Sequence, residues 1–198
     1  HAGYTYSGAR LAETFASWDS TKVKRVFILG PSHHVYFKGK ALVSKYGHYA
    51  TPLGALKVDT EVTKQLVENG PFEYMTPDID EDEHSFEMHA PFVYHSARNL
   101  PQGIPTIVPI MISASTRELD SHIAELLVPY LNHEENTFVI SSDFCHWGSR
   151  FNYTSYIAEK GSSLSLLVTM DRFTKIEQPI YKSIEELDKL AMQVVSTG

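Results

Sequence analysis

Histidine residues occur at three places where a predicted element ends, and this spacing suggests a shared site. His1 opens the motif HAGYTYSG, His33 lies in GPSHH after the strand-like run 23–29, and His146 lies in DFCHWG after an apolar run. Because the carboxyl ends of parallel strands meet at one edge of an open sheet, we expect these imidazoles to converge on one cleft. Imidazoles bind metals and carry protons near neutral pH, so the predicted chemistry is metal binding or proton transfer.

Further side chains are candidates for the same pocket. Neighbouring residues of an extended chain point to opposite sides, so one of His33 and His34 should face the cleft. Tyr4 follows the first histidine closely. Helical spacing places Glu87 beside His84, which predicts a carboxylate and an imidazole supporting the first ligands from behind.

The segment SSDFCHWG is the most specific motif of the chain. Asp143 lies three residues before His146, where it can orient an imidazole or assist a metal site, and Trp147 can form an apolar wall. Ser142 and Asp143 would also allow a serine-hydrolase triad, but the glycine-flanked nucleophile elbow is missing. Cys145 is a weaker candidate for a catalytic thiol than for a small buried residue.

Several of these residues also have a purely structural explanation. A histidine such as His1 can cap a helix or fill a turn. The acidic run from Asp80 to Glu83 precedes a predicted helix, whose N-terminus stabilises negative charge. That explanation accounts for the carboxylates of the run but not for His84 and Glu87.

Short apolar strands alternate with helical stretches along the chain. This order predicts an α/β fold with a mostly parallel sheet covered by helices on both faces. One segment, 161–179, has little periodicity and is expected to be either an inserted loop or an error in the reading frame. The expected strands are 23–29, 41–44, 106–112 and 137–141, with a loop at 47–54, and the expected helices are 7–18, 59–68, 85–99, 116–131 and 184–195.

Composition excludes several classes of function. The formal charge is −7, from 17 basic and 24 acidic residues, and no long basic run is present, so nucleic acid is not an expected partner. No apolar run approaches the roughly 20 residues that span a bilayer. A single cysteine excludes an intrachain disulfide and favours a reducing, cytoplasmic compartment.

Five separated motifs, HAGYTYSG, GPSHH, TPLG, DEDEHSFEMHAP and SSDFCHWG, together resemble the MEMO family, the mediators of ErbB2-driven cell motility and their relatives. The resemblance runs from His1 to about Tyr156 and resumes at Ile180. It implies a single domain over 1–198 whose fold is similar to that of the LigB-like class III extradiol dioxygenases. The eukaryotic branch of the family is the closer match.

The resemblance also implies a site and a function. It implies that His1 and His33 bind iron or copper and that His146 lies in the same pocket. In animal members a C-terminal cysteine is the third ligand; Cys145 lies in a different motif, and the chain stops at Gly198 before such a segment. We therefore expect segments to be missing at both ends, a weak metal site and marginal stability.

Three functions remain open on this basis. The first is an adaptor in motility signalling, cytoplasmic and also nuclear, whose cleft binds a phosphotyrosine peptide or a receptor tail. The second is an iron- or copper-dependent oxidoreductase in which His146 and Asp143 are catalytic, since two histidines and a further ligand are typical of oxygen-activating iron sites. The third is a truncated copy without function.

Overall fold

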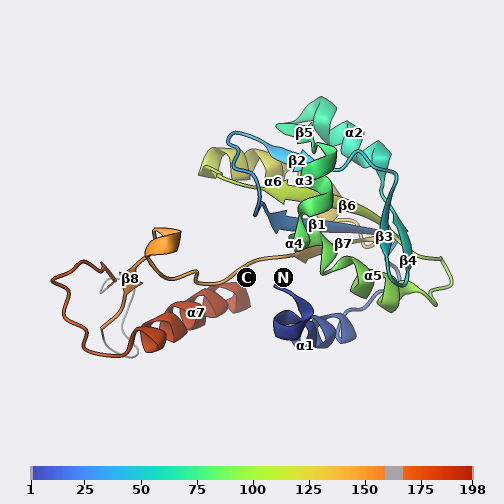
Figure 1. Cartoon of the computed structure of the whole chain (residues 1–198). Helices are drawn as coiled ribbons and strands as arrows, with labels where there is room; N and C mark the ends of the chain where they lie inside the picture. The colour runs from blue at the N-terminus through green and yellow to red at the C-terminus, as the bar shows by residue number, and fades with distance from the viewer. Residues whose placement is uncertain (1, 159–166, 198) are drawn as a thin grey trace. The chain divides into compact units, whose positions relative to one another are not determined.

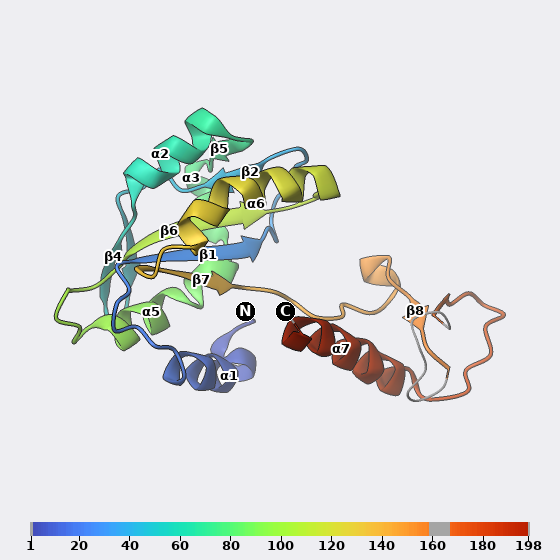
Figure 2. The same ribbon diagram turned by 180° about the vertical axis from the view of Figure 1, so that it is seen from behind.

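The computed structural model describes residues 2–158 and 167–197. These residues form two compact units, His1–Ser142 and Asp143–Gly198, and each is described separately (Figures 1 and 2). The prediction of one domain over the whole chain stays a prediction.

A five-stranded sheet forms the centre of the first unit. Its strand order is β5-β2-β6-β1-β7, and only the pairing of β2 with β6 is antiparallel. The sequence-based prediction of an α/β fold with a mostly parallel sheet is therefore confirmed. The strands are β1 Arg25–Pro31, β2 Ala41–Val43, β5 Phe72–Tyr74, β6 Thr106–Ile112 and β7 Asn136–Ile140.

Helices cover both faces of this sheet because its central strands are apolar on both sides. Val26 and Ile28 of β1 pack in one core cluster with Phe86. Phe27, which lies between them in the strand and is fully buried, packs in the other cluster with Ile123. Figures 1 and 2 show the two helical layers on opposite faces. One layer contains α2 Thr60–Asn69 and α6 Arg117–Leu131, and the other contains α1 Tyr4–Ala16, α4 His84–Glu87 and α5 Ala90–Ala97.

Two local elements differ from the sequence-based expectation. The segment 47–54, expected as a loop, belongs to a hairpin of β3 His48–Thr51 and β4 Gly54–Lys57. The expected helix 85–99 is divided into α4 and α5, and α3 Pro77–Asp82 occupies the acidic run before them. Proline at the start of α5 favours a new helix there, because its missing N–H would have no partner in the first turn.

The carboxyl end of β1 and the start of α4 approach each other closely. A Cβ atom added at Gly30 would lie 2.5 Å from Ser85 Oγ, which is shorter than real contacts of this kind. The Ser85 hydroxyl donates a hydrogen bond to the carbonyl oxygen of Pro31 at 3.0 Å. Glycine at position 30 therefore allows α4 to rest directly on the strand end.

The second unit is built around an amphipathic helix and a short ribbon. Strands β8 Ser155–Tyr156 and β9 Val168–Thr169 pair antiparallel, and α7 Ile180–Thr197 follows. Part of the expected insertion 161–179 thus pairs with 155–156, while its residues 161–166 lie outside the described residues. Within the described parts of the chain, no helix is both long and apolar enough to span a membrane.

Candidate metal centre

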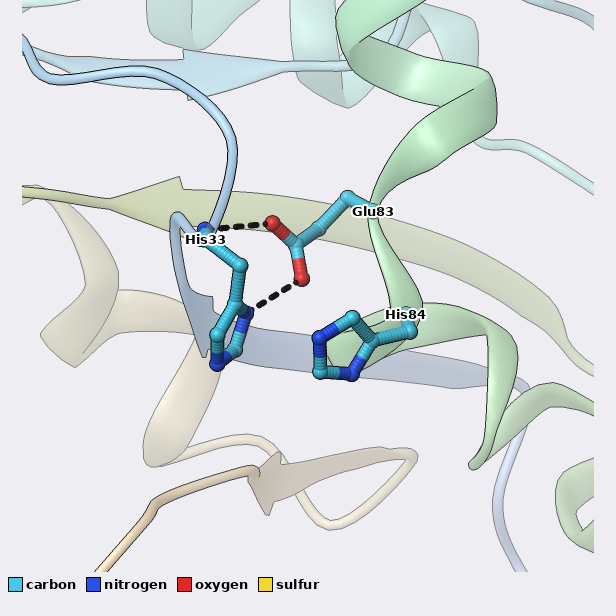
Figure 3. Close-up of side chains that lie close together, drawn as sticks. All are labelled: His33, Glu83 and His84. Atoms are coloured by element: carbon cyan, nitrogen blue, oxygen red, sulfur yellow. Dashed lines mark hydrogen bonds and ion pairs between the residues drawn. The ribbon is translucent and has the colours of Figure 1, made fainter. Parts of the chain in front are cut away.

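Three potential metal ligands meet between the end of β1 and the start of α4. His33, Glu83 and His84 each offer a ligand atom, and these atoms all lie within 4.8 Å of one another. The imidazole rings of His33 and His84 have centroids 4.1 Å apart at an angle of 33°. Figure 3 shows the two rings side by side, with the Glu83 carboxylate facing His33.

The Glu83 carboxylate is held by hydrogen bonds from two elements. It accepts one from the backbone N–H of His33 at 2.9 Å, and His33 Nδ1 lies 2.8 Å from Oε1 (Figure 3). It also accepts one from the Ser85 N–H at 2.8 Å, which caps the start of α4. One carboxylate therefore fixes the strand end, the helix start and an imidazole relative to one another.

The electrostatics of this group favour an ionised carboxylate. The side chain of Glu83 is only 1% exposed, and burial alone would raise its pKa. The hydrogen bonds from His33 and Ser85 outweigh burial and hold the pKa of Glu83 below its ordinary value. The group thus presents a negative charge beside two imidazoles, which suits a cation.

The structure places the other predicted residues of the first unit around this group. The His34 ring lies 6.3 Å from the His84 ring and is exposed. Glu87 and Tyr4 line a neighbouring cavity of about 430 Å³, and the Tyr4 hydroxyl donates to the Met88 carbonyl at 3.1 Å. Burial and the nearby charge of Glu87 raise the pKa of Tyr4, so its phenol stays protonated.

His1 and Ser142 are the two predicted site residues at the ends of the first unit. His1 lies outside the described residues, so its predicted role as a ligand stays a prediction. Ser142 is exposed at the end of the first unit, and its predicted place in the pocket also stays a prediction.

The remaining predicted residues belong to the second unit. Asp143 Oδ2 lies 3.5 Å from His146 Nε2, a distance that suits the predicted orientation of the imidazole. The Trp147 indole N–H donates to the Ser155 carbonyl at 2.7 Å. Burial and the charge of Asp188 raise the pKa of Cys145, which disfavours the thiolate that a nucleophile requires.

Glu83 is the ligand candidate that the sequence reasoning did not identify. The negative charge of Glu83 already has a structural explanation, because its carboxylate caps the start of α4. The missed signal is the dipeptide Glu83-His84 at a helix start, since a carboxylate and an imidazole adjacent in sequence can both reach a strand end there.

Comparison with known proteins gives consistent matches along the chain. The family model described as "Memo-like protein" matches residues 1–198. The chain is similar to the MEMO1 family protein MHO1 of Saccharomyces cerevisiae, with 40% identity over 99% of this chain and 64% of that protein. It is 42% identical to the MEMO1 family protein C4H3.04c of Schizosaccharomyces pombe over 100% of this chain and 64% of that protein.

An animal relative matches over a similar part of its length. Protein MEMO1 of Xenopus laevis is 41% identical over 98% of this chain and 59% of that protein. The chain thus spans less than two thirds of the length of these three relatives.

Proposed function

This chain belongs to the Memo-like protein family, and on that premise we propose that it is a metal-binding protein whose ligands are His33, Glu83 and His84. The observation that carries the proposal is the convergence of three ligand atoms within 4.8 Å. Iron or copper, which the family resemblance implies, is the metal to be considered first.

The distance between His33 Nδ1 and Glu83 Oε1 would allow a metal ion to replace the proton that these two atoms share. At metal–ligand distances of about 2.1 Å, two neighbouring ligand atoms of one ion lie about 3 Å apart. His33 Nδ1 and Glu83 Oε1, at 2.8 Å, already have this separation. A divalent ion can therefore replace the proton between them, with a ligand atom of His84 within 4.8 Å as the third donor.

The chemistry of the donors fits Fe(II) and also Cu(II), which imidazole suits equally, but it does not fit Cu(I). Two imidazoles and one carboxylate are the ligand set of non-haem Fe(II) sites that keep open positions. Copper(I) prefers soft sulfur ligands, and the donor set here contains none. A bound Fe(II) would supply redox chemistry, so an iron-dependent oxidoreductase is the second function that this ligand set supports.

An anaerobic titration tests the metal site. We expect calorimetry of the full chain with Fe(II) to show one site, and His84→Ala to weaken binding at least tenfold because one of three ligands is removed. His34→Ala is the matched control, since His34 is a neighbouring exposed imidazole outside the ligand group. Equal affinities of wild type and His84→Ala would refute this ligand set.

The family resemblance also implies an adaptor role, which we propose as a further function of this chain. A phosphotyrosine peptide would find a donor in the exposed imidazole of His34, whereas the neighbouring cavity is lined by carboxylates and disfavours phosphate. Binding of a phosphorylated peptide but not of its unphosphorylated form would support the adaptor role, and equal binding would oppose it. A cytoplasmic or nuclear location stays a prediction.

A further inference from the structure

A cavity beside the metal centre has its own chemistry. Its volume is about 430 Å³, within the range of about 300–1,000 Å³ that small-molecule sites have. It lies within the first unit, between the β3–β4 hairpin, the start of α1 and the segment that contains α3 and α4. It is lined by Tyr4, Tyr46, His48, Tyr49, Ala50, Thr51, Pro52, Asp80, Glu81, Glu83, Glu87, Met88, Ala90 and Pro91.

Three tyrosines contribute aromatic surface to this cavity. Their hydroxyl groups already donate to the protein: Tyr46 to Glu81 at 3.3 Å, Tyr49 to Asp80, and Tyr4 to a backbone carbonyl. What these residues still offer to a ligand is mainly ring surface. The face of a tyrosine ring attracts cations within about 6 Å.

The charged side chains that line the cavity are almost all acidic. Four carboxylates, those of Asp80, Glu81, Glu83 and Glu87, line it, and among the residues that the structure describes no lysine or arginine does. Asp80 is held by Ser44 and Tyr49, and Glu83 by His33 and Ser85, whereas Glu81 and Glu87 are exposed. The two exposed carboxylates are therefore the ones available to a ligand that enters from solvent.

We infer that this cavity binds a small organic cation, an alkylguanidinium or alkylammonium compound whose charged end lies between the tyrosine rings and the carboxylates of Glu81 and Glu87. Three features combine to support it: a volume suited to a small molecule, aromatic walls, and an acidic lining to which no lysine or arginine of the described parts of the chain contributes. The inference goes beyond the metal site, with which the cavity shares Glu83 alone.

A charged and neutral pair of probes tests the inference directly. Calorimetric titration of the full chain with n-butylguanidinium should show saturable binding, whereas n-butylurea, of the same shape but neutral, should bind at least fivefold more weakly. Equal affinity for the two probes, or no binding of n-butylguanidinium, would overturn the inference.

Variants locate the binding within the cavity. We expect Glu87→Gln and Glu81→Gln each to weaken n-butylguanidinium binding by about three- to tenfold, since each removes a charge but keeps the shape. Glu125→Gln, on the exposed surface of α6, is the matched control and should change nothing. Unchanged affinity in both cavity variants would show that the probe binds elsewhere.

A third variant separates this inference from the metal proposal. His84→Ala should retain n-butylguanidinium affinity, because His84 does not line the cavity. The same variant should lose Fe(II) affinity if the metal proposal holds. Each proposal therefore fails on its own readout, and loss of n-butylguanidinium binding in His84→Ala would count against a separate cation site.

Discussion

Glu83 joins structure and proposed chemistry in a single side chain. It is almost fully buried and accepts hydrogen bonds from His33 and Ser85, yet those same bonds keep it ionised. A buried charge is tolerated when it is paired and hydrogen-bonded, and removing its partners or its charge is costly. Glu83 should therefore affect both stability and metal affinity when it is changed.

We expect Glu83→Gln to weaken Fe(II) binding at least tenfold and to lower the free energy of unfolding by about 1–3 kcal/mol. The amide has one acceptor oxygen in place of two, so one N–H group loses its partner. Urea unfolding and Fe(II) calorimetry measure the two effects, with Asp82→Asn as the control at a neighbouring exposed carboxylate. Wild-type stability in Glu83→Gln would show that the carboxylate network contributes little.

His89 is a second buried titratable residue, and its role is structural. Burial lowers the pKa of His89 to about 4, although its hydrogen bond with the Ser85 carbonyl at 2.9 Å acts in the opposite direction. The unfolded chain, with a histidine pKa of about 6.5, then binds more protons than the folded one between these two values. The titration of His89 therefore has no effect on stability above pH 6.5, and it destabilises the fold as the pH falls toward 4.

We expect the loss from His89 to reach about 3 kcal/mol across this window, since each pH unit corresponds to about 1.4 kcal/mol for one proton. Urea unfolding from pH 7 to pH 4 should show a shallower decline of stability for His89→Gln than for wild type. His95→Gln, at an exposed position of α5, should follow wild type. Parallel curves for His89→Gln and wild type would contradict the assignment.

At the scale of elements, much of the sheet could be predicted because buried parallel strands are continuous apolar runs. The strand 106–112 was placed at its observed bounds, and 137–141 differs by one residue at each end. The hairpin 48–57 was missed because residue polarity does not follow the alternating burial of its strands, with Ala50 and Ala55 exposed, and because Pro52 and Gly54 indicate a loop. The break between α4 and α5 does have a local signal, the proline near the start of α5, but the prediction of one helix over 85–99 did not take it into account.

The close contact between β1 and α4 depends on the absence of a side chain at Gly30. A methyl group at position 30 would collide with the Ser85 side chain, so α4 would move away from the strand end. We expect Gly30→Ala to lower the free energy of unfolding by about 1–3 kcal/mol and to weaken Fe(II) binding, because His33 and the two ligands at the start of α4 would separate. Chemical unfolding and calorimetry provide the measurements.

Gly47→Ala is the matched control for this change. A Cβ atom there meets nothing within 4 Å, and its backbone is not in the left-handed region. It should retain both stability and metal affinity. If Gly30→Ala behaves like Gly47→Ala, the approach of α4 to β1 does not position the ligands.

At the scale of the whole molecule, the family and the fold class could be predicted from five ordered motifs, but the candidate site only in part. His33 and His84 were identified, His33 as a ligand and His84 as a supporting residue, because they stand beside predicted element ends. Glu83 and the tyrosine-lined cavity were not, since they depend on how the hairpin packs beside α3 and α4.

The net negative charge of the chain should act in opposite directions on its two proposed ligands, an organic cation and a phosphotyrosine peptide. The formal charge is −7, and the cavity adds a local concentration of carboxylates, so the field should attract organic cations and repel phosphate. Salt screens such fields over about 10 Å at 0.1 M. Raising the salt concentration should therefore weaken n-butylguanidinium binding measured by calorimetry, and a phosphotyrosine peptide should bind no more weakly. A cation affinity that is independent of salt would show that ring contact and shape, rather than charge, determine binding in the cavity.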